Sequence, residues 1–163
     1  TGSLSLQWRE ILKTKAGVIK LADNAKIKLI LKQTADGSTD SSELFTRGEF
    51  REHGGSFFID YDESEATGYA GSHVQLRIGQ QDDTVTMTRT GKAFSSLVFE
   101  NGKRHFCQYG TEYGDCMIGI STVDMRNGMT SDGGELYVRY TIDANAGLML
   151  ENEITIHVKP HNN

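Results

Sequence analysis

The sequence predicts an all-β protein, an antiparallel up-and-down β-barrel of about 8–10 strands. Two observations carry this prediction. After residue 25 the apolar residues recur at every second position, which is the period of a half-buried strand. Short segments rich in Gly, Asn and Asp separate these runs, and such short links join antiparallel neighbours, because a parallel crossover needs about a dozen residues.

Five runs show the alternation most clearly, and parity assigns the apolar side of each to the interior. These sides are Ile27, Leu29 and Leu31; Val74, Leu76 and Ile78; Val85 and Met87; Leu136, Val138, Tyr140 and Ile142; and Ile154, Ile156 and Val158. A long meander with one solvent-exposed face must bury its apolar face and pair its two edge strands. Closure into a barrel does both. A β-sandwich is the alternative.

The turn segments include "ADGS", "HGGS" and "ENGK". In the last of these, Asn101-Gly102 lies between apolar runs, which is the composition of a two-residue type I′ hairpin turn. Such a turn requires a positive φ at both residues. We therefore expect a tight hairpin there.

The segment before residue 25 has a different pattern. Apolar residues from Trp8 to Ile19 have helical spacing that Gly17 interrupts, so a short amphipathic helix and an added strand both stay open. The opening "TGS" has the composition of a tag or processing remnant. We expect an N-terminal extension over residues 1–24, one barrel domain over 25–159, and a tail over 160–163.

Charge narrows the classes of partner. The net charge is −5, yet residues 1–32 hold seven Lys/Arg and two Asp/Glu, whereas the rest of the chain is acidic. An acidic body argues against nucleic acid and anionic membranes, because phosphates favour a basic face. The basic segment either binds a partner or pairs with its own acidic domain.

The chain has two cysteines, which form no disulfide framework, so we expect a cytoplasmic protein. We also expect no cofactor.

Several motifs have a familiar order and spacing. "FFIDYDESEATG", "VTMTRTGKAFSSLVFENGKR", "YGTEYGD" and "GGELYVRYTID…NEITIHV" resemble the YwiB-like family of small bacterial proteins. The resemblance covers roughly residues 27–158 and implies a calycin-like (lipocalin-like) β-barrel with room for a ligand cavity. It implies no established activity, and a fold alone does not supply one.

The stretch "RHFCQYGTEYGDCMIGI" holds both cysteines. A tight loop would place Cys107 near Cys116, but their spacing and the single nearby His105 fall short of a zinc site. His105 lies on the same face of the strand as Cys107, without a third group to orient it as a base. We expect two free thiols in the core and no metal.

Arg89 is the most informative candidate residue. It continues the inward phase of Val85 and Met87, and a buried guanidinium needs a carboxylate or carbonyl partner. Glu63 follows the inward phase of Tyr61 and is the predicted partner. Two roles stay open for Arg89: it closes one end of the barrel, as calycin barrels do with an arginine packed on a Trp, here Trp8, or it anchors an anion.

Three tyrosines complete the candidate ligand site. Tyr61 and Tyr140 are on inward phases, and Tyr109 opens the Tyr-Gly loop. Tyrosines give a pocket apolar walls with a polar tip, although they do the same in any core.

Three functions are consistent with these residues. A binding module would hold a small, partly apolar ligand at Arg89, Tyr61, Tyr140, Glu63 and Tyr109. A protein-interaction domain would have a filled core and no ligand, and would bind another protein or a second copy. An enzyme ranks last, because no triad, metal set or phosphate loop is present in the sequence. An apolar pocket of about 300 Å³ or more would favour the ligand.

Overall fold

The computed structural model describes residues 23–65, 68–111, 113–144, 147 and 149–161. Within these ranges the chain forms ten strands and no helix that could cross a membrane. The strands are β1 (Ala25–Ala35), β2 (Ser38–His53), β3 (Ser56–Asp62), β4 (His73–Gly79), β5 (Thr84–Thr90), β6 (Ser95–Glu100), β7 (Arg104–Thr111), β8 (Gly114–Asn127), β9 (Gly134–Asp143) and β10 (Met149–Pro160). Residues 8–19, including Trp8, lie outside the described residues, so the expected helix or added strand lies outside them too.

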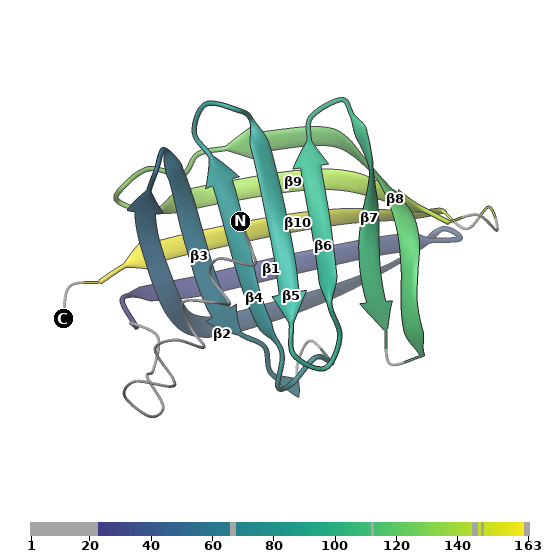
Figure 1. Ribbon diagram of the computed structural model, residues 1–163, viewed down its shortest axis with the longest axis horizontal. Helices are drawn as coiled ribbons and strands as arrows, with labels where there is room; N and C mark the ends of the chain where they lie inside the picture. The colour runs from purple at the N-terminus through teal and green to yellow at the C-terminus, as the bar shows by residue number, and fades with distance from the viewer. Residues whose placement is uncertain (1–22, 66–67, 112, 145–146, 148, 162–163) are drawn as a thin grey trace.

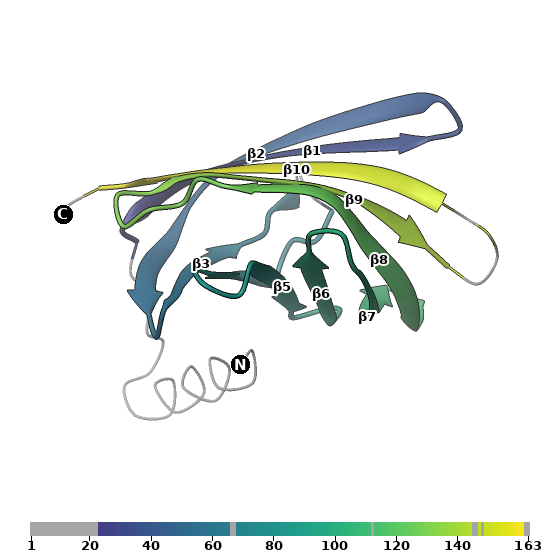
Figure 2. The ribbon, with the colours of Figure 1, turned by 90° about the horizontal axis from the view of Figure 1, so that it is seen from above.

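The strands close into one antiparallel barrel, as the alternation and the short links predict. Each strand pairs with its neighbours in the chain, and β1 closes the barrel by pairing with β10 from Ala25↔Pro160 to Thr34↔Glu151. Figure 1 shows the short strands β3 to β7 in front of the long strands β1, β9 and β10. Figure 2 shows the same two walls from above, with the β1–β2 hairpin extending beyond the rest.

The core lies between these walls and contains the predicted inward residues. All the apolar positions assigned by parity are buried, except Leu31 and Ile142, which are partly buried and packed against the core. The outward faces of β3 and β4 were expected to be exposed to solvent, but they are partly buried. Asp60 and Gln75 are buried there, and Gln75 donates a hydrogen bond to Asp60.

Type I′ geometry occurs at other turns than the one expected. Asp36 and Gly37 both have positive φ, and so do Gly54 and Gly55, in the "ADGS" and "HGGS" hairpins. At "ENGK" the tight turn is present, with Lys103 N–H donating to the carbonyl of Glu100, but the type I′ assignment is wrong, because only Gly102 has a positive φ. Gly102 N–H instead donates to the carbonyl of Thr122 on β8, and this contact holds the turn against a strand that is not part of the hairpin.

The β6–β7 pair is the least regular part of the barrel. Its ladder contains only Ser95↔Tyr109 and Ser96↔Gln108 in register. Beyond these pairs, Val98 N–H points at the sulfur of Cys107, 3.4 Å away, and not at a carbonyl. We call this interrupted ladder the β6–β7 seam.

Candidate functional site

A cavity of about 190 Å³ lies inside the barrel. The five residues selected from the sequence all line it: Arg89, Tyr61, Tyr140, Glu63 and Tyr109. They come from β3, the residue that follows it, β5, β7 and β9, which alternate around the barrel. Parity therefore identified side chains that converge on one space although they are far apart in the sequence.

Arg89 and Glu63 form a buried, two-pronged ion pair. Arg89 Nε donates to Glu63 Oε2 at 2.8 Å, and Nη2 donates to Oε1 at 3.0 Å. The side chains are 14% and 3% exposed. Burial alone would lower the pKa of Arg89, but the hydrogen bonds and charge of Glu63 outweigh it and raise that pKa. The structure confirms Glu63 as the predicted partner of Arg89.

Tyr69 covers one face of this pair. Its ring lies 3.8 Å from the Arg89 guanidinium carbon, and its hydroxyl is 2.8 Å from the hydroxyl of Tyr109. Arg89 thus packs on an aromatic ring, whereas the expected contact with Trp8 lies outside the described residues. The sequence reasoning missed Tyr69 because it lies in the loop between β3 and β4, where no alternation assigns a side chain to the interior.

Tyr140 and Asn152 form the polar part of the opposite wall. Asn152 Nδ2 donates to the Tyr140 hydroxyl at 3.2 Å, whereas Asn152 Oδ1 has no hydrogen-bond partner among the described residues. Both residues are buried. Sequence reasoning missed Asn152. Parity could have found it, because Asn152 shares the inward phase of Ile154 and Ile156.

Tyr61, Tyr109 and Tyr140 stay protonated at neutral pH. Burial is the largest cause that raises the pKa of Tyr61, Tyr109 and Tyr140. The charge of Glu63 raises the pKa of Tyr61 further, whereas Arg89 lowers it. The cavity therefore offers hydroxyls, the amides of Gln33 and Asn152 and one internally neutralised ion pair, with aliphatic walls such as Leu29 and Leu97. The exposed Glu43 adds a carboxylate to the lining.

The two cysteines lie apart. Cys107 pairs with Ile118 in the β7–β8 register, and Cys116 pairs with Tyr109. Cys107 is buried as expected. The prediction of a core position is wrong for Cys116, which is exposed near the start of β8. His105 Nε2 donates a hydrogen bond to the Glu100 carboxylate at 3.0 Å, and no group of three or more metal-ligating side chains is present among the described residues.

This placement predicts a split in thiol reactivity. Unfolded, non-reduced protein should titrate two thiols, whereas native protein should react rapidly at Cys116 alone. Burial raises the pKa of Cys107, although the Val98 N–H lowers it in part, and a buried thiol presents little thiolate to a reagent. The measurement is titration with a chromogenic disulfide reagent, and Cys116→Ser should remove the fast phase. Two fast thiols in native protein would contradict the burial of Cys107.

Comparison with known proteins agrees with this architecture. The chain is similar to the ywiB protein from Bacillus subtilis, whose crystal structure superimposes with a TM-score of 0.70 at 14% sequence identity. The alignment covers 86% of this chain and 93% of the other, and at this identity it shows the fold alone. No curated protein matches the chain. Residues 27–156 match the model of a domain of unknown function, DUF1934, and the chain therefore belongs to this family.

Proposed function

We propose that this protein is a non-enzymatic binding module, and that its barrel holds a small, partly apolar ligand in the cavity. The observation that carries the proposal is the convergence of Arg89, Glu63, Tyr61, Tyr109 and Tyr140 on one cavity of the barrel. A cavity with apolar walls and a few fixed polar groups is the usual form of a small-molecule site. The placement of this barrel among the calycins belongs to the same proposal, and so does a cytoplasmic location.

The charges of the site favour an uncharged ligand. Both prongs of the Arg89 fork are held by Glu63, and the face of the guanidinium is stacked on Tyr69. An anion at this position would meet the Glu63 carboxylate, and a cation would meet Arg89. The pair thus serves as a neutral, polar end wall and not as the anion anchor considered from the sequence.

The volume of the cavity sets the size of the ligand. A dry cavity of about 150 Å³ accepts benzene, and drug-sized ligands need about 300 Å³ or more. At about 190 Å³, this cavity is smaller than the volume set as the criterion from the sequence, and it suits one substituted six-membered ring. A hydrogen-bond donor on that ring would satisfy Asn152 Oδ1, which otherwise keeps the free-energy cost of an unpaired buried acceptor.

The lining favours binding over catalysis. No His or Cys is among the described residues that line the cavity, and Tyr61, Tyr109 and Tyr140 are neutral at physiological pH. The Glu63 carboxylate is occupied by Arg89. A general base must reach a substrate proton with an available lone pair, and the other carboxylate of the lining, Glu43, is an exposed residue of β2.

The proposal is tested by titrating the protein with phenol, toluene and benzoate, followed by amide NMR shifts. We expect phenol and toluene to shift residues around the cavity, phenol at lower concentration, and benzoate to leave them unchanged. Native mass spectrometry of freshly purified protein should show a small, uncharged co-purified molecule. A cavity that takes none of the probes would overturn the proposal and favour the filled-core interaction domain.

Two neighbouring positions on β6 provide a matched pair of variants. Leu97 lines the cavity, whereas Val98 is on the outward face of the same strand. Leu97→Phe should weaken phenol binding at least about tenfold by filling the space, at a stability cost of about 1–3 kcal/mol. Val98→Phe should leave binding unchanged. Equal effects of the two variants would place the probe outside the cavity.

A further inference from the structure

The outer surface of the barrel carries a row of three like charges. Lys26 on β1 is directly opposite Arg47 on β2 and Lys159 on β10 in the ladder register, and all three side chains are exposed. Like charges directly opposite each other on one face of a sheet destabilise it. This row therefore costs the isolated barrel stability.

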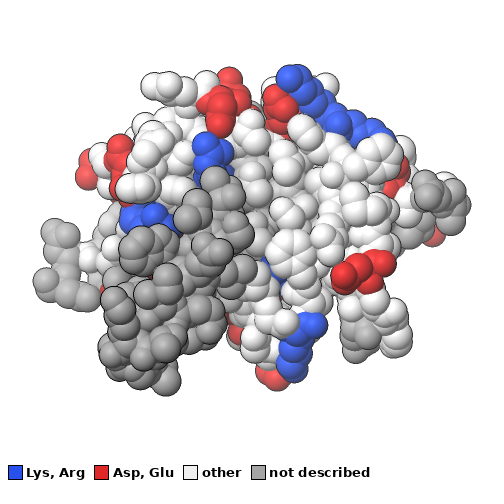
Figure 3. All heavy atoms as spheres, viewed as in Figure 1, with Lys and Arg blue, Asp and Glu red and all other residues white. Residues whose placement is uncertain are grey.

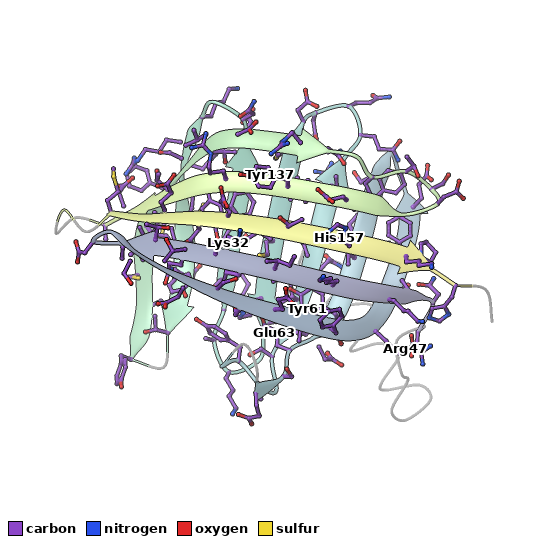
Figure 4. The ribbon with its side chains drawn as sticks, turned by 180° about the vertical axis from the view of Figure 1, so that it is seen from behind. Lys32, Arg47, Tyr61, Glu63, Tyr137 and His157 are labelled. Carbon is purple, nitrogen blue, oxygen red and sulfur yellow. The ribbon has the colours of Figure 1, made fainter. Side chains whose placement is uncertain are left out.

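The next row adds an aromatic surface to this charge. Lys28 is opposite Phe45 and His157, and its ammonium lies 5.2 Å from the centre of the Phe45 ring. Phe45 is 69% exposed. Together the two rows line a groove of about 790 Å³, which we call the outer basic groove: Lys26, Lys28, Phe45, Arg47, His157 and Lys159. Figure 4 shows the side of the barrel that contains it, with Arg47 and His157 labelled.

The positive charge of this groove is only partly balanced. Asp23 is 3.6 Å from Arg47, and Glu135 is 3.3 Å from His157. Lys26, Lys28 and Lys159 form no ion pair with any residue that the structure describes. The ammonium groups of two exposed lysines, Lys26 and Lys159, and of the half-buried Lys28 thus lie unpaired near one large, exposed aromatic side chain.

The groove contrasts with the rest of the molecule. The chain has a net charge of −5. The face formed by β4 to β7 shows mostly uncharged atoms, with scattered charges of both signs (Figure 3). A long polyanion such as nucleic acid would extend beyond the groove, and the net negative charge of the chain opposes its approach. A short acidic segment fits the groove without this penalty, and an apolar side chain in it would cover Phe45.

We propose that the outer basic groove is a docking site for an acidic polypeptide segment with apolar residues between its carboxylates. The carboxylates bind Lys26, Lys28 and Lys159, and an apolar side chain packs on Phe45 and on the aliphatic stems of the lysines. This interaction is separate from the barrel cavity, so either site can be lost without the other.

The test uses a fluorescein-labelled peptide of alternating Glu and Leu, with binding followed by fluorescence anisotropy. Lys26→Glu should weaken binding about tenfold or more, because it replaces an attraction by a repulsion. The same variant places a carboxylate between Arg47 and Lys159, so the Tm of the free protein should rise by about 1–3 °C. Weak binding by a more stable variant cannot come from unfolding.

Matched controls are available on the same molecule. Lys32→Glu makes the same change of charge on the same face of β1, away from the groove (Figure 4), and should change binding less than about twofold. Phe45→Ser should weaken binding, whereas Phe106→Ser, at an equally exposed phenylalanine on β7, should not.

Three outcomes would overturn the proposal. One is equal weakening by Lys26→Glu and Lys32→Glu, which would indicate attraction to the overall charge and not to the groove. The others are tighter binding of an oligonucleotide of equal charge, or of phosphatidylserine vesicles, than of the peptide.

Discussion

Replacement of Arg89 by Ala should lower the free energy of unfolding by about 3–5 kcal/mol, the usual cost of removing one partner from a buried ion pair. The cost arises on Glu63, whose 3% exposed carboxylate would lose both hydrogen bonds and its counter-charge. The ring of Tyr69 would also lose the guanidinium on which it stacks. Urea unfolding of the free protein, followed by circular dichroism, measures the change.

Two further variants separate charge from geometry. Arg89→Lys keeps the charge but loses the fork of donors, so we expect a loss of about 1–3 kcal/mol. Arg89→Met combined with Glu63→Leu removes both charges and should recover most of the stability lost in Arg89→Ala. If Arg89→Ala unfolds like the wild type, the pair does not close the barrel end, and Arg89 is available to a ligand after all.

Replacement of Phe99 by Ala should cost a similar 3–5 kcal/mol or so, because it deletes a large, fully buried side chain of the core. The Phe99 ring packs at 58° against Tyr140, with 4.7 Å between the ring centres. Tyr140 lines the cavity, so the space left by Phe99 would lie next to it. We expect the variant to bind toluene more tightly than the wild type does, and to accept larger apolar rings.

Calorimetry and the toluene titration together check this expectation. Phe106→Ala is the control: its ring is 65% exposed, and its loss should change stability by less than about 1 kcal/mol. A destabilised Phe99→Ala variant with unchanged affinity for toluene would show that the barrel collapses into the space, and that Tyr140 does not keep the cavity open.

The inward half of the candidate site could be predicted because strands obey parity. Once Val85 and Met87 are assigned to the interior, Arg89 must follow them, and Glu63 follows Tyr61 in the same way. The pairing of Arg89 with Glu63 then follows from the cost of an isolated buried charge. These inferences need only the local period of each strand and no knowledge of the loops.

The rest depends on contacts that no local pattern encodes. Tyr69 reaches Arg89 from a loop, and Asn101-Gly102 takes a different turn because Thr122 of β8 binds its backbone. Cys116 is exposed because the β7–β8 hairpin places it at the barrel end, beyond the core. The row of like charges could not be predicted from the sequence, because Lys26, Arg47 and Lys159 become neighbours only through the register of three strands.

The β6–β7 seam divides the barrel into parts of unequal resistance to hydrogen exchange. The amides of β1 and β10 are held by a continuous ladder from Ala25↔Pro160 to Thr34↔Glu151, and they become free only when the whole domain unfolds. At the seam, only two residue pairs are in register, and the Val98 amide is held by a weak hydrogen bond to sulfur. Deuterium should therefore enter β6 and β7 through small, local openings. Because Leu97 and Tyr109 flank the seam and also line the cavity, these openings would change the shape of the cavity without unfolding the barrel.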